Sequence, residues 1–285
     1  MLSISPRGNA EEAENYYQHL NETEEYYDVK SESGEWQGSG LASIGIGEGE
    51  TVTKEQFSNL LRGRSPDGID LVKNAGNNHR SGFDLTFSAP KAVSILFGLS
   101  DKTNADAIIQ AHQNAVEKAI DYIEQEAAIS RTGSNGEIKQ KSGLIVAKFT
   151  HETSRNDDMQ LHTHSFSMAL CQREDGKYGA IESRKIFQHK MSAGAIYRAE
   201  LAHQIRELGY QTEQDGDSFR ITNLDKKLET EFSTRRAEIV EALKNSGHKG
   251  SKASEIAALS TRKAKDHNTS KVEIKQSWLD RAEEF

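Results

Sequence analysis

The 285-residue sequence predicts an α+β protein in which one mainly antiparallel sheet is backed by helices. Three observations lead to this prediction. Segments such as Gly82–Ser88 and Leu161–Leu170 alternate polar and apolar residues with the two-residue period of a strand. Asn104–Ile129 carries apolar residues at helical spacing, which indicates a long amphipathic helix. From Leu224 onward the pattern is helical throughout, in three segments.

Capping residues mark two helix starts in the N-terminal part. Asn9 followed by Glu12 is a candidate capping box, and Thr53 is suited to cap a second helix. The segment between these helices is rich in Gly, Ser and Glu, with Trp36 as its single anchor, which predicts a loop. In order, the predicted elements are a strand at Leu2–Ser5, a helix from Asn9 to about Leu20, a loop at Ser31–Gly49 and a helix at Thr53–Arg62.

Strands and helices follow one another through the rest of the chain. Pro90 suits the first turn of a helix, where its missing N–H is not needed, and Gly209 suits a helix end. The sequence predicts strands at Gly82–Ser88, Leu144–His151, Leu161–Leu170 and Lys177–Ile181, a helix at Ser192–Leu208 and a hairpin at Tyr210–Ile221. The sheet is expected to combine the strands that begin near Leu2, Gly82, Leu144, Leu161 and Tyr178.

Composition restricts the class of protein. The single cysteine, Cys171, excludes an internal disulfide and fits a reducing compartment. No apolar run approaches the length of a membrane span and the N-terminus has no charged-then-apolar leader, so we expect neither a span nor a secretory signal. The sequence also has no G-x4-G-K-[ST] phosphate loop, which excludes a P-loop ATPase motor.

Charge is unevenly distributed along the chain. The net charge of −8, taken as a total, argues against a nucleic-acid partner. Asn223–Phe285 nevertheless carries 13 Lys and Arg against 11 Asp and Glu, whereas nine acidic residues fall between Glu11 and Glu35 against the single Lys30. A surface can be locally basic inside an acidic total, but the composition does not show one here.

Three histidines on two predicted strands form a candidate metal site. His151 ends the apolar face of its strand, and His162 and His164 share a face with Phe166 on the next. The polar segment Thr153–Met159 joins the strands, so an antiparallel hairpin would turn all three imidazoles to one side. Three imidazoles can hold one divalent ion and leave coordination positions open for substrate. The alternative is that each histidine is a hydrogen-bonded structural residue.

Two tyrosine pairs near the N-terminus are a second feature. Tyr16-Tyr17 and Tyr26-Tyr27 hold half of the chain's eight tyrosines. Packing on an amphipathic helix accounts for such pairs, but a metal site makes a nucleophilic tyrosine a hypothesis as well. A phenol with a pKa of about 10 is only about 0.1% ionised at neutral pH, so it needs a base or a substrate activated by a metal.

These features belong to a longer ordered series of motifs. The series is Tyr16-Tyr17, Tyr26-Tyr27, Glu35-Trp36-Gln37-Gly38, Asp84-Leu85-Thr86-Phe87-Ser88-Ala89-Pro90-Lys91, His151-Glu152-Thr153-Ser154-Arg155 and Leu161-His162-Thr163-His164. It resembles the N-terminal nicking domain of conjugative relaxases of the relaxase-helicase (MobF-type) class, in the His-hydrophobe-His nuclease superfamily. The resemblance runs from Leu2 to roughly Ile221 and continues more loosely into the tail. The combined motifs are specific, whereas the His-x-His pair alone is not.

The resemblance implies a fold and a reaction. The fold is a palm-like five-stranded sheet with the histidines at its centre and a helical C-terminal lid. The reaction is metal-dependent, site- and strand-specific nicking of plasmid transfer-origin DNA: a tyrosine hydroxyl attacks the scissile phosphate, giving a covalent 5′-phosphotyrosine and a free 3′ hydroxyl. The reverse step joins the strand. The implied nucleophiles are Tyr16 first and Tyr26 second, with Tyr17 and Tyr27 as the alternatives within each pair.

Further site residues and a cofactor follow from the same resemblance. Asp84 matches the carboxylate that orients one of the metal ligands, a role that fixes the imidazole tautomer. Relaxases are generally supported by Mg2+ or Mn2+, whereas three imidazoles favour Zn2+, Ni2+ or Cu2+ by ligand softness. The implied metal ligands are His151, His162 and His164, and the candidate contacts to DNA phosphates are Arg80, Lys91 and Arg155, for which solvated surface charge is the alternative.

The resemblance also implies partners and a domain division. The partners are single-stranded or hairpin transfer-origin DNA, accessory DNA-bending proteins and the type IV secretion coupling protein, for a monomer without a membrane span. The implied location is the bacterial cytoplasm, with passage into the recipient cell alongside the DNA. We expect residues 1–222 to form the catalytic core and residues 223–285 a helical extension that closes over DNA, with the usual helicase domain absent from this chain.

Two rival functions remain open from the sequence. A three-histidine metalloenzyme acting on a small molecule predicts no role for Tyr16. A non-catalytic origin-recognition module predicts sequence-specific DNA binding without a covalent product and without a metal in the purified protein.

Overall fold

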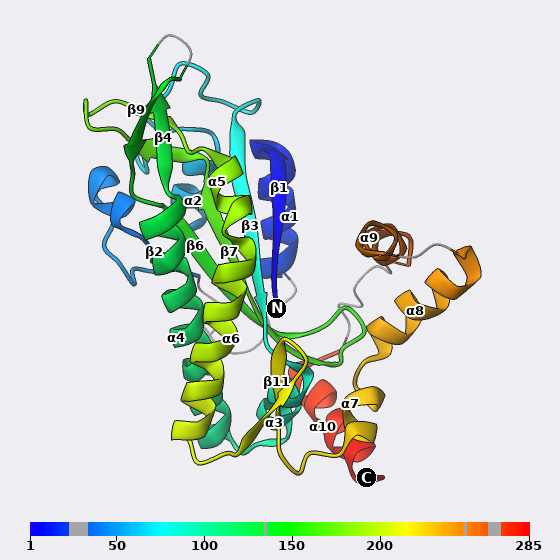
Figure 1. The fold of residues 1–285 in the computed structure, drawn as a ribbon. Helices are drawn as coiled ribbons and strands as arrows, with labels where there is room; N and C mark the ends of the chain where they lie inside the picture. The colour runs from blue at the N-terminus through cyan, green and yellow to red at the C-terminus, as the bar shows by residue number, and fades with distance from the viewer. Residues whose placement is uncertain (23–33, 134–135, 248–249, 262–268) are drawn as a thin grey trace. The chain divides into compact units, whose positions relative to one another are not determined.

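The computed structural model describes the chain outside residues 23–33, 134–135, 248–249 and 262–268 (Figure 1). The described residues form two compact units. The first comprises Met1–Ser88, Ala111–His151 and His162–Gln204, and the second comprises Ala89–Gln110, Glu152–Leu161 and Ile205–Phe285. Within the described part of the chain, no helix combines the length and apolar character needed to cross a membrane.

A five-stranded antiparallel sheet confirms the predicted fold class. Its strand order is β1-β3-β7-β6-β2, so β7 lies in the middle. The strands are β1 (Leu2–Asn9), β2 (Glu35–Gln37), β3 (Arg80–Ser88), β6 (Val146–Thr153) and β7 (Met159–Met168). Because successive side chains alternate between the two faces, the register of β3 and β7 determines which residues meet on each face.

Two of the sequence-based strand assignments were wrong. Glu35–Gln37 lies in the predicted loop, yet it forms β2 because Trp36 is fully buried and pairs with Ala147 at the sheet edge. The strand at Tyr178–Ala180, β9, was expected in the central sheet but pairs with β8 (Leu170–Gln172) in a separate two-stranded sheet. A further hairpin, β4 (Ile129–Thr132) with β5 (Ile138–Lys141), was not predicted.

Helices cover both faces of the sheet. On one face α4 and α6 run side by side (Figure 1), joined by a 3.5 Å hydrogen bond from Asn114 to Gln204. On the other face α1 and α2 pack, and Thr53 caps α2 as the sequence predicts, in a capping box completed by Gln56. The helices are α1 (Ala10–Glu22), the 3-10 helix η1 (Ser39–Ile44), α2 (Lys54–Leu61), α3 (Lys91–Leu99), α4 (Lys102–Ala127), α5 (Ser183–Gln188), α6 (Lys190–Glu207), α7 (Lys226–Glu231), α8 (Thr234–Ser246), α9 (Ser251–Ser260) and α10 (Lys271–Ala282).

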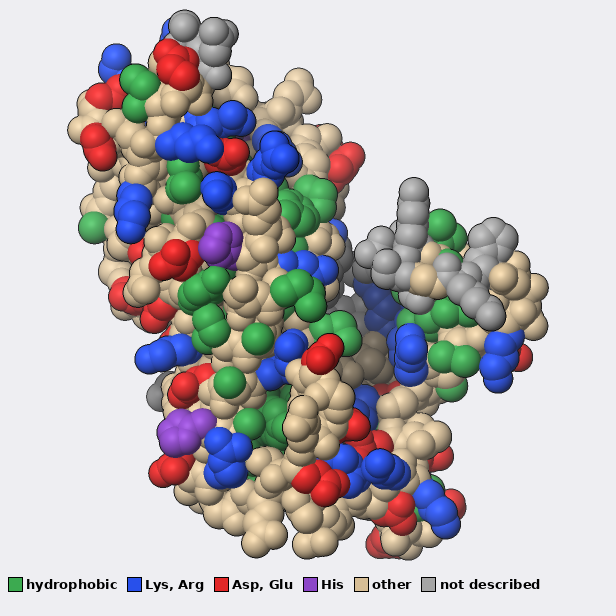
Figure 2. Space-filling model, in the orientation of Figure 1, with side chains coloured by type: hydrophobic (Ala, Val, Ile, Leu, Met, Phe, Trp, Pro, Cys, Tyr) green, Lys and Arg blue, Asp and Glu red, His purple; other side chains and the backbone are tan. Residues whose placement is uncertain are grey.

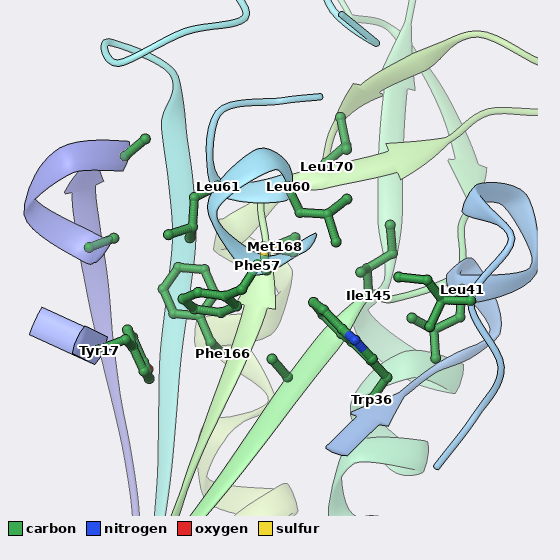
Figure 3. Close-up of a cluster of buried hydrophobic side chains, with 14 of the residues drawn as sticks. Tyr17, Trp36, Leu41, Phe57, Leu60, Leu61, Ile145, Phe166, Met168 and Leu170 are labelled. Carbon is green, nitrogen blue, oxygen red and sulfur yellow. The ribbon is translucent and has the colours of Figure 1, made fainter. Parts of the chain in front are cut away.

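An aromatic core lies between the sheet and helices α1 and α2 (Figure 3). Tyr17 from α1 is its centre, because the ring centroids of Phe57, Phe149 and Phe166 each lie 5.2 Å from that of Tyr17. Each fully buried aromatic side chain contributes about 1.5–3 kcal/mol through removal of apolar surface from water. The cluster therefore fixes α1 against the face of the sheet that carries Phe149 and Phe166.

In the second unit, the loop between β6 and β7 is fastened to the C-terminal helices. Asp158 is almost fully buried and accepts hydrogen bonds from the Thr234 backbone N–H at 2.9 Å and from the Arg281 guanidinium at 3.2 Å. Trp278 Nε1 donates to the Asp157 carbonyl at 2.6 Å. The same unit contains the predicted hairpin, formed by β10 (Thr212–Asp215) and β11 (Ser218–Ile221).

Candidate active site

The structure brings the three candidate histidines together on the central strands of the sheet. His151 lies on β6, and His162 and His164 lie two residues apart on β7, so all three face the side that carries Phe166. Their ring centroids are 5.4 Å apart for His151 and His162, 5.5 Å for His151 and His164, and 5.2 Å for His162 and His164. The local cause is the two-residue period of adjacent antiparallel strands.

The spacing of these rings suits a single small ion. With metal–nitrogen bonds of about 2.1 Å and tetrahedral angles, the ring centres of imidazole ligands lie about 5.2 Å apart. Within the part of the chain that the structure describes, however, no group of three or more His, Cys, Asp or Glu side chains has the arrangement of a metal site. The cluster thus has the ring spacing of a three-imidazole site without its final ligand geometry.

Asp84 is the carboxylate beside this cluster. It projects from β3, is almost fully buried, and lies 3.0 and 3.1 Å from His164 Nδ1 through its two carboxylate oxygens. Arg7 from β1 donates to Asp84 Oδ2 at 2.6 Å, and the Thr86 hydroxyl lies 3.1 Å from the same His164 nitrogen. An imidazole whose Nδ1 is engaged in this way would bind a metal through Nε2.

The surroundings of Asp84 keep it ionised. Burial alone would raise its pKa, but the His164 imidazole and the Arg7 guanidinium outweigh burial and lower the pKa from 3.8 to about 2. The sequence identified Asp84 and His164 but missed Arg7 and Thr86. Arg7 could not be found by pattern, because its partner lies 77 residues away and the pairing depends on the register between β1 and β3.

Of the tyrosine pair on α1, the structure describes the side chain of Tyr17 alone. Tyr17 is buried, with its ring in the aromatic core and its ring centroid 6.4 Å from that of His164. The backbone of Tyr16 precedes it on the same helix, about 3.8 Å away between Cα atoms. The side chain of Tyr16 lies outside the described structure, as do Tyr26 and Tyr27 entirely. Helix α1 therefore passes directly beside the histidine cluster.

The three candidate DNA-contact residues occupy different settings. Arg80 begins β3, is exposed, and stacks over the Phe83 ring at 5.1 Å. Lys91 begins α3, and its Nζ donates to the Met159 carbonyl at 2.7 Å, while burial lowers its pKa to about 8. Arg155 lies half-buried in the loop between β6 and β7. On the face shown in Figure 2, basic and acidic side chains are interspersed.

A family model described as TrwC relaxase matches residues 10–285 of the chain. Among curated proteins, the chain is 34% identical over 293 residues to the multifunctional conjugation protein TraI of Escherichia coli (strain K12). That match covers 98% of this chain but only 16% of the relative, so the chain spans about a sixth of the length of the relative it matches.

Solved structures show the same similarity in three dimensions. A copper-bound complex of the conjugative relaxase TrwC with oriT DNA has a TM-score of 0.88 and 30% identity, covering 100% of this chain and 98% of the other. A metal-free complex of TrwC with oriT DNA has a TM-score of 0.85 and 29% identity, with the same coverage.

Proposed function

This chain belongs to the TrwC relaxase family, and from that premise we propose that it nicks and rejoins one strand of transfer-origin DNA through a tyrosine nucleophile. The observation that carries the proposal is the joint placement of three imidazoles, the ionised Asp84 and helix α1. Asp84 contacts His164 at 3.0 Å, and Tyr17 on α1 lies against the same imidazole. A tyrosine hydroxyl beside a site that can hold a divalent ion would supply the nucleophile and the Lewis acid for phosphoryl transfer to tyrosine.

Tyr16 is the first nucleophile in this proposal. Its neighbour Tyr17 is fully enclosed by phenylalanines, which removes that hydroxyl from contact with a DNA strand. Attack by Tyr16 Oη on phosphorus forms the phosphotyrosine bond and breaks the bond to the 3′ oxygen, which leaves with a proton. One phosphodiester replaces another, so the reverse reaction rejoins the strand without ATP. Tyr26 is proposed to act second, with Tyr27 as the alternative.

His151, His162 and His164 are proposed to hold a divalent ion. When bound, the ion would act as a Lewis acid on a non-bridging phosphate oxygen and offset the developing charge. Asp84, held by Arg7, fixes the tautomer and orientation of His164. Structures of the relative TrwC have been solved with copper and without metal. The ion proposed here is Mg2+ or Mn2+, which generally support relaxases, and the alternatives are Zn2+, Ni2+ and Cu2+, which three imidazole ligands favour.

Further parts of the proposal concern substrate and organisation. The proposed substrate is single-stranded or hairpin DNA of a transfer origin, whose phosphates contact Arg80, Lys91 and Arg155. The proposed location is the cytoplasm of a bacterium, and the proposed partners are accessory DNA-bending proteins and a coupling protein. Residues 1–222 are assigned as the catalytic core. Residues 223–285 are assigned as a helical extension that closes over DNA, which would place the chain's basic tail near phosphates.

The test uses single-stranded oligonucleotides tiled across the DNA that flanks the gene. Each is incubated with protein and Mg2+ or Mn2+ and separated on a denaturing gel, with Tyr16→Phe, Tyr17→Phe and His162→Ala in parallel. A protein–DNA adduct that is lost on chelation and in Tyr16→Phe, but kept in Tyr17→Phe, is the expected result. Binding to one oligonucleotide without an adduct would instead indicate a recognition module. Failure to bind any oligonucleotide would favour a small-molecule metalloenzyme.

A further inference from the structure

A buried chain of hydrogen bonds lies on the opposite side of the sheet from the histidine cluster. His112, in the middle of α4, is fully buried and contacts two hydroxyls. Its Nε2 lies 2.9 Å from Thr163 Oγ1 on β7, and its Nδ1 lies 2.8 Å from the Tyr197 hydroxyl on α6. Thr163 Oγ1 in turn lies 2.9 Å from Thr150 Oγ1 on β6. This chain of four side chains, the clamp, joins two helices to two strands.

Each strand residue of the clamp is a sequence neighbour of a candidate metal ligand. Thr163 separates His162 from His164, and Thr150 precedes His151. Because side chains alternate along a strand, the threonine hydroxyls point to the helix side while the imidazoles point to the other. The clamp therefore fixes, from behind, the relative position of the two strand segments that carry all three imidazoles.

The proton arrangement in the clamp follows from burial. Burial lowers the pKa of His112 to about 3, so the imidazole is neutral at physiological pH, with one N–H and one acceptor nitrogen. Burial also raises the pKa of Tyr197 well above 10, so it remains a phenol. A fully buried phenol needs an acceptor for its proton, which is met when Tyr197 donates to Nδ1, Nε2–H donates to Thr163, and Thr163 donates to Thr150.

We infer that His112 is a positioning residue for the three-histidine site, acting through Thr163 and Thr150 to hold the imidazoles of β6 and β7 at ligand spacing. The inference rests on the proposed metal-binding role of those histidines. The cluster already has the ring spacing of a three-imidazole site but not its final geometry. A rigid support behind the strands would reduce the rearrangement needed when an ion binds. Outer groups that orient ligands typically change metal affinity about 10- to 100-fold when removed.

The test compares metal binding in matched variants of the full chain. Thr163→Val removes the clamp hydroxyl with little change in shape, Thr163→Ser retains a hydroxyl, and His112→Leu removes the imidazole. Ser165→Ala is the control, because Ser165 is also fully buried on β7, faces the same side as Thr163 and takes no part in the clamp. The dissociation constant for Mn2+ is measured by calorimetry, and that for Co2+ by its visible absorption, at a temperature where circular dichroism shows every variant to be folded.

We expect Thr163→Val and His112→Leu to weaken metal binding by about tenfold and to alter the Co2+ spectrum, which reports ligand geometry. Thr163→Ser and Ser165→Ala should match the wild type. If His112→Leu does not fold, Thr163→Val decides the question alone. Equal affinities and spectra for Thr163→Val and Ser165→Ala would overturn the positioning role.

The three-histidine metal site, on which this inference rests, is tested independently with His162→Ala. If His162→Ala binds Mn2+ and Co2+ as tightly as the wild type, or the wild type binds neither ion, the three-histidine metal site is wrong and the positioning role is overturned with it. If His162→Ala abolishes binding while the clamp variants do not weaken it, only the positioning role is overturned.

Discussion

Replacing Asp84 by Asn tests the buried charge beside the histidines. The lowering of its pKa from 3.8 to about 2 means that the folded protein favours the ionised carboxylate by roughly 2 kcal/mol relative to an ordinary aspartate. Asp84→Asn removes this stabilisation of the ionised carboxylate and leaves the Arg7 guanidinium without its carboxylate partner. We therefore expect the free energy of unfolding to fall by about 2–4 kcal/mol at neutral pH.

The sign of the pH dependence is also determined. A carboxylate with a lowered folded-state pKa contributes stability that is complete above about pH 4 and is lost as the pH falls through about 2. The difference between wild type and Asp84→Asn should shrink over that window. The assay is guanidinium unfolding, followed by circular dichroism in chelator at a series of pH values.

An exposed ion pair of similar length provides the control. Asp70 meets Arg64 at 2.8 Å, but the Asp70 side chain is 63% exposed and that of Arg64 is 37% exposed, so Asp70→Asn should cost less than about 1 kcal/mol. Equal losses for Asp84→Asn and Asp70→Asn, or a loss for Asp84→Asn that is the same at every pH, would refute the account of Asp84. In the presence of metal, Asp84→Asn should also weaken metal binding about 10- to 100-fold.

Other predictions address the helices around the site. Tyr17→Ala should lower the free energy of unfolding by about 3–5 kcal/mol because it empties the aromatic core. Chemical denaturation measures this loss, and a loss below about 1 kcal/mol would contradict the packing of Tyr17. Burial lowers the pKa of His112 from 6.5 to about 3. The free energy of unfolding of the wild type should therefore fall by up to about 1.4 kcal/mol per pH unit as the pH drops from 6.5 to 3. His112→Gln should flatten that slope, and an unchanged slope would contradict a buried neutral imidazole. Trp278→Ala removes a buried ring and its hydrogen bond to Asp157, so limited proteolysis should cut the loop between β6 and β7 faster than in the wild type. Equal cleavage rates would contradict the conclusion that Trp278 holds this loop against the C-terminal helices.

Local periodicity was sufficient for much of the fold. The alternation in Gly82–Ser88 correctly predicted a strand, and in β3 Phe83 and Phe87 lie on the face opposite Asp84, because a two-residue period is a property of the strand itself. Helical spacing also identifies the buried face of α1. Ala10, Ala13 and Tyr17 are all buried and recur at the spacing of one helix face.

Contacts set by register or by distant partners could not be predicted. Strand β2 has three residues, too few for alternation to show, and forms because Trp36 meets Ala147 across a sheet edge. The His112 contacts join positions 51 and 85 residues apart. The pairing of β2 and the contacts of His112 both depend on which faces meet after folding, and periodicity in a single sequence does not indicate which faces meet.

The direct passage from β1 into α1 has a consequence for how this family can vary in length. Strand β1 ends at Asn9 and α1 begins at Ala10, with no loop between them. An inserted or deleted residue between Ala10 and Tyr16 would turn the rest of the helix by about 100°. It would place a different residue against the phenylalanines and move Tyr17 out of the aromatic core. We therefore expect related sequences to accept substitutions here but not gaps, and to confine length differences to the connections between elements.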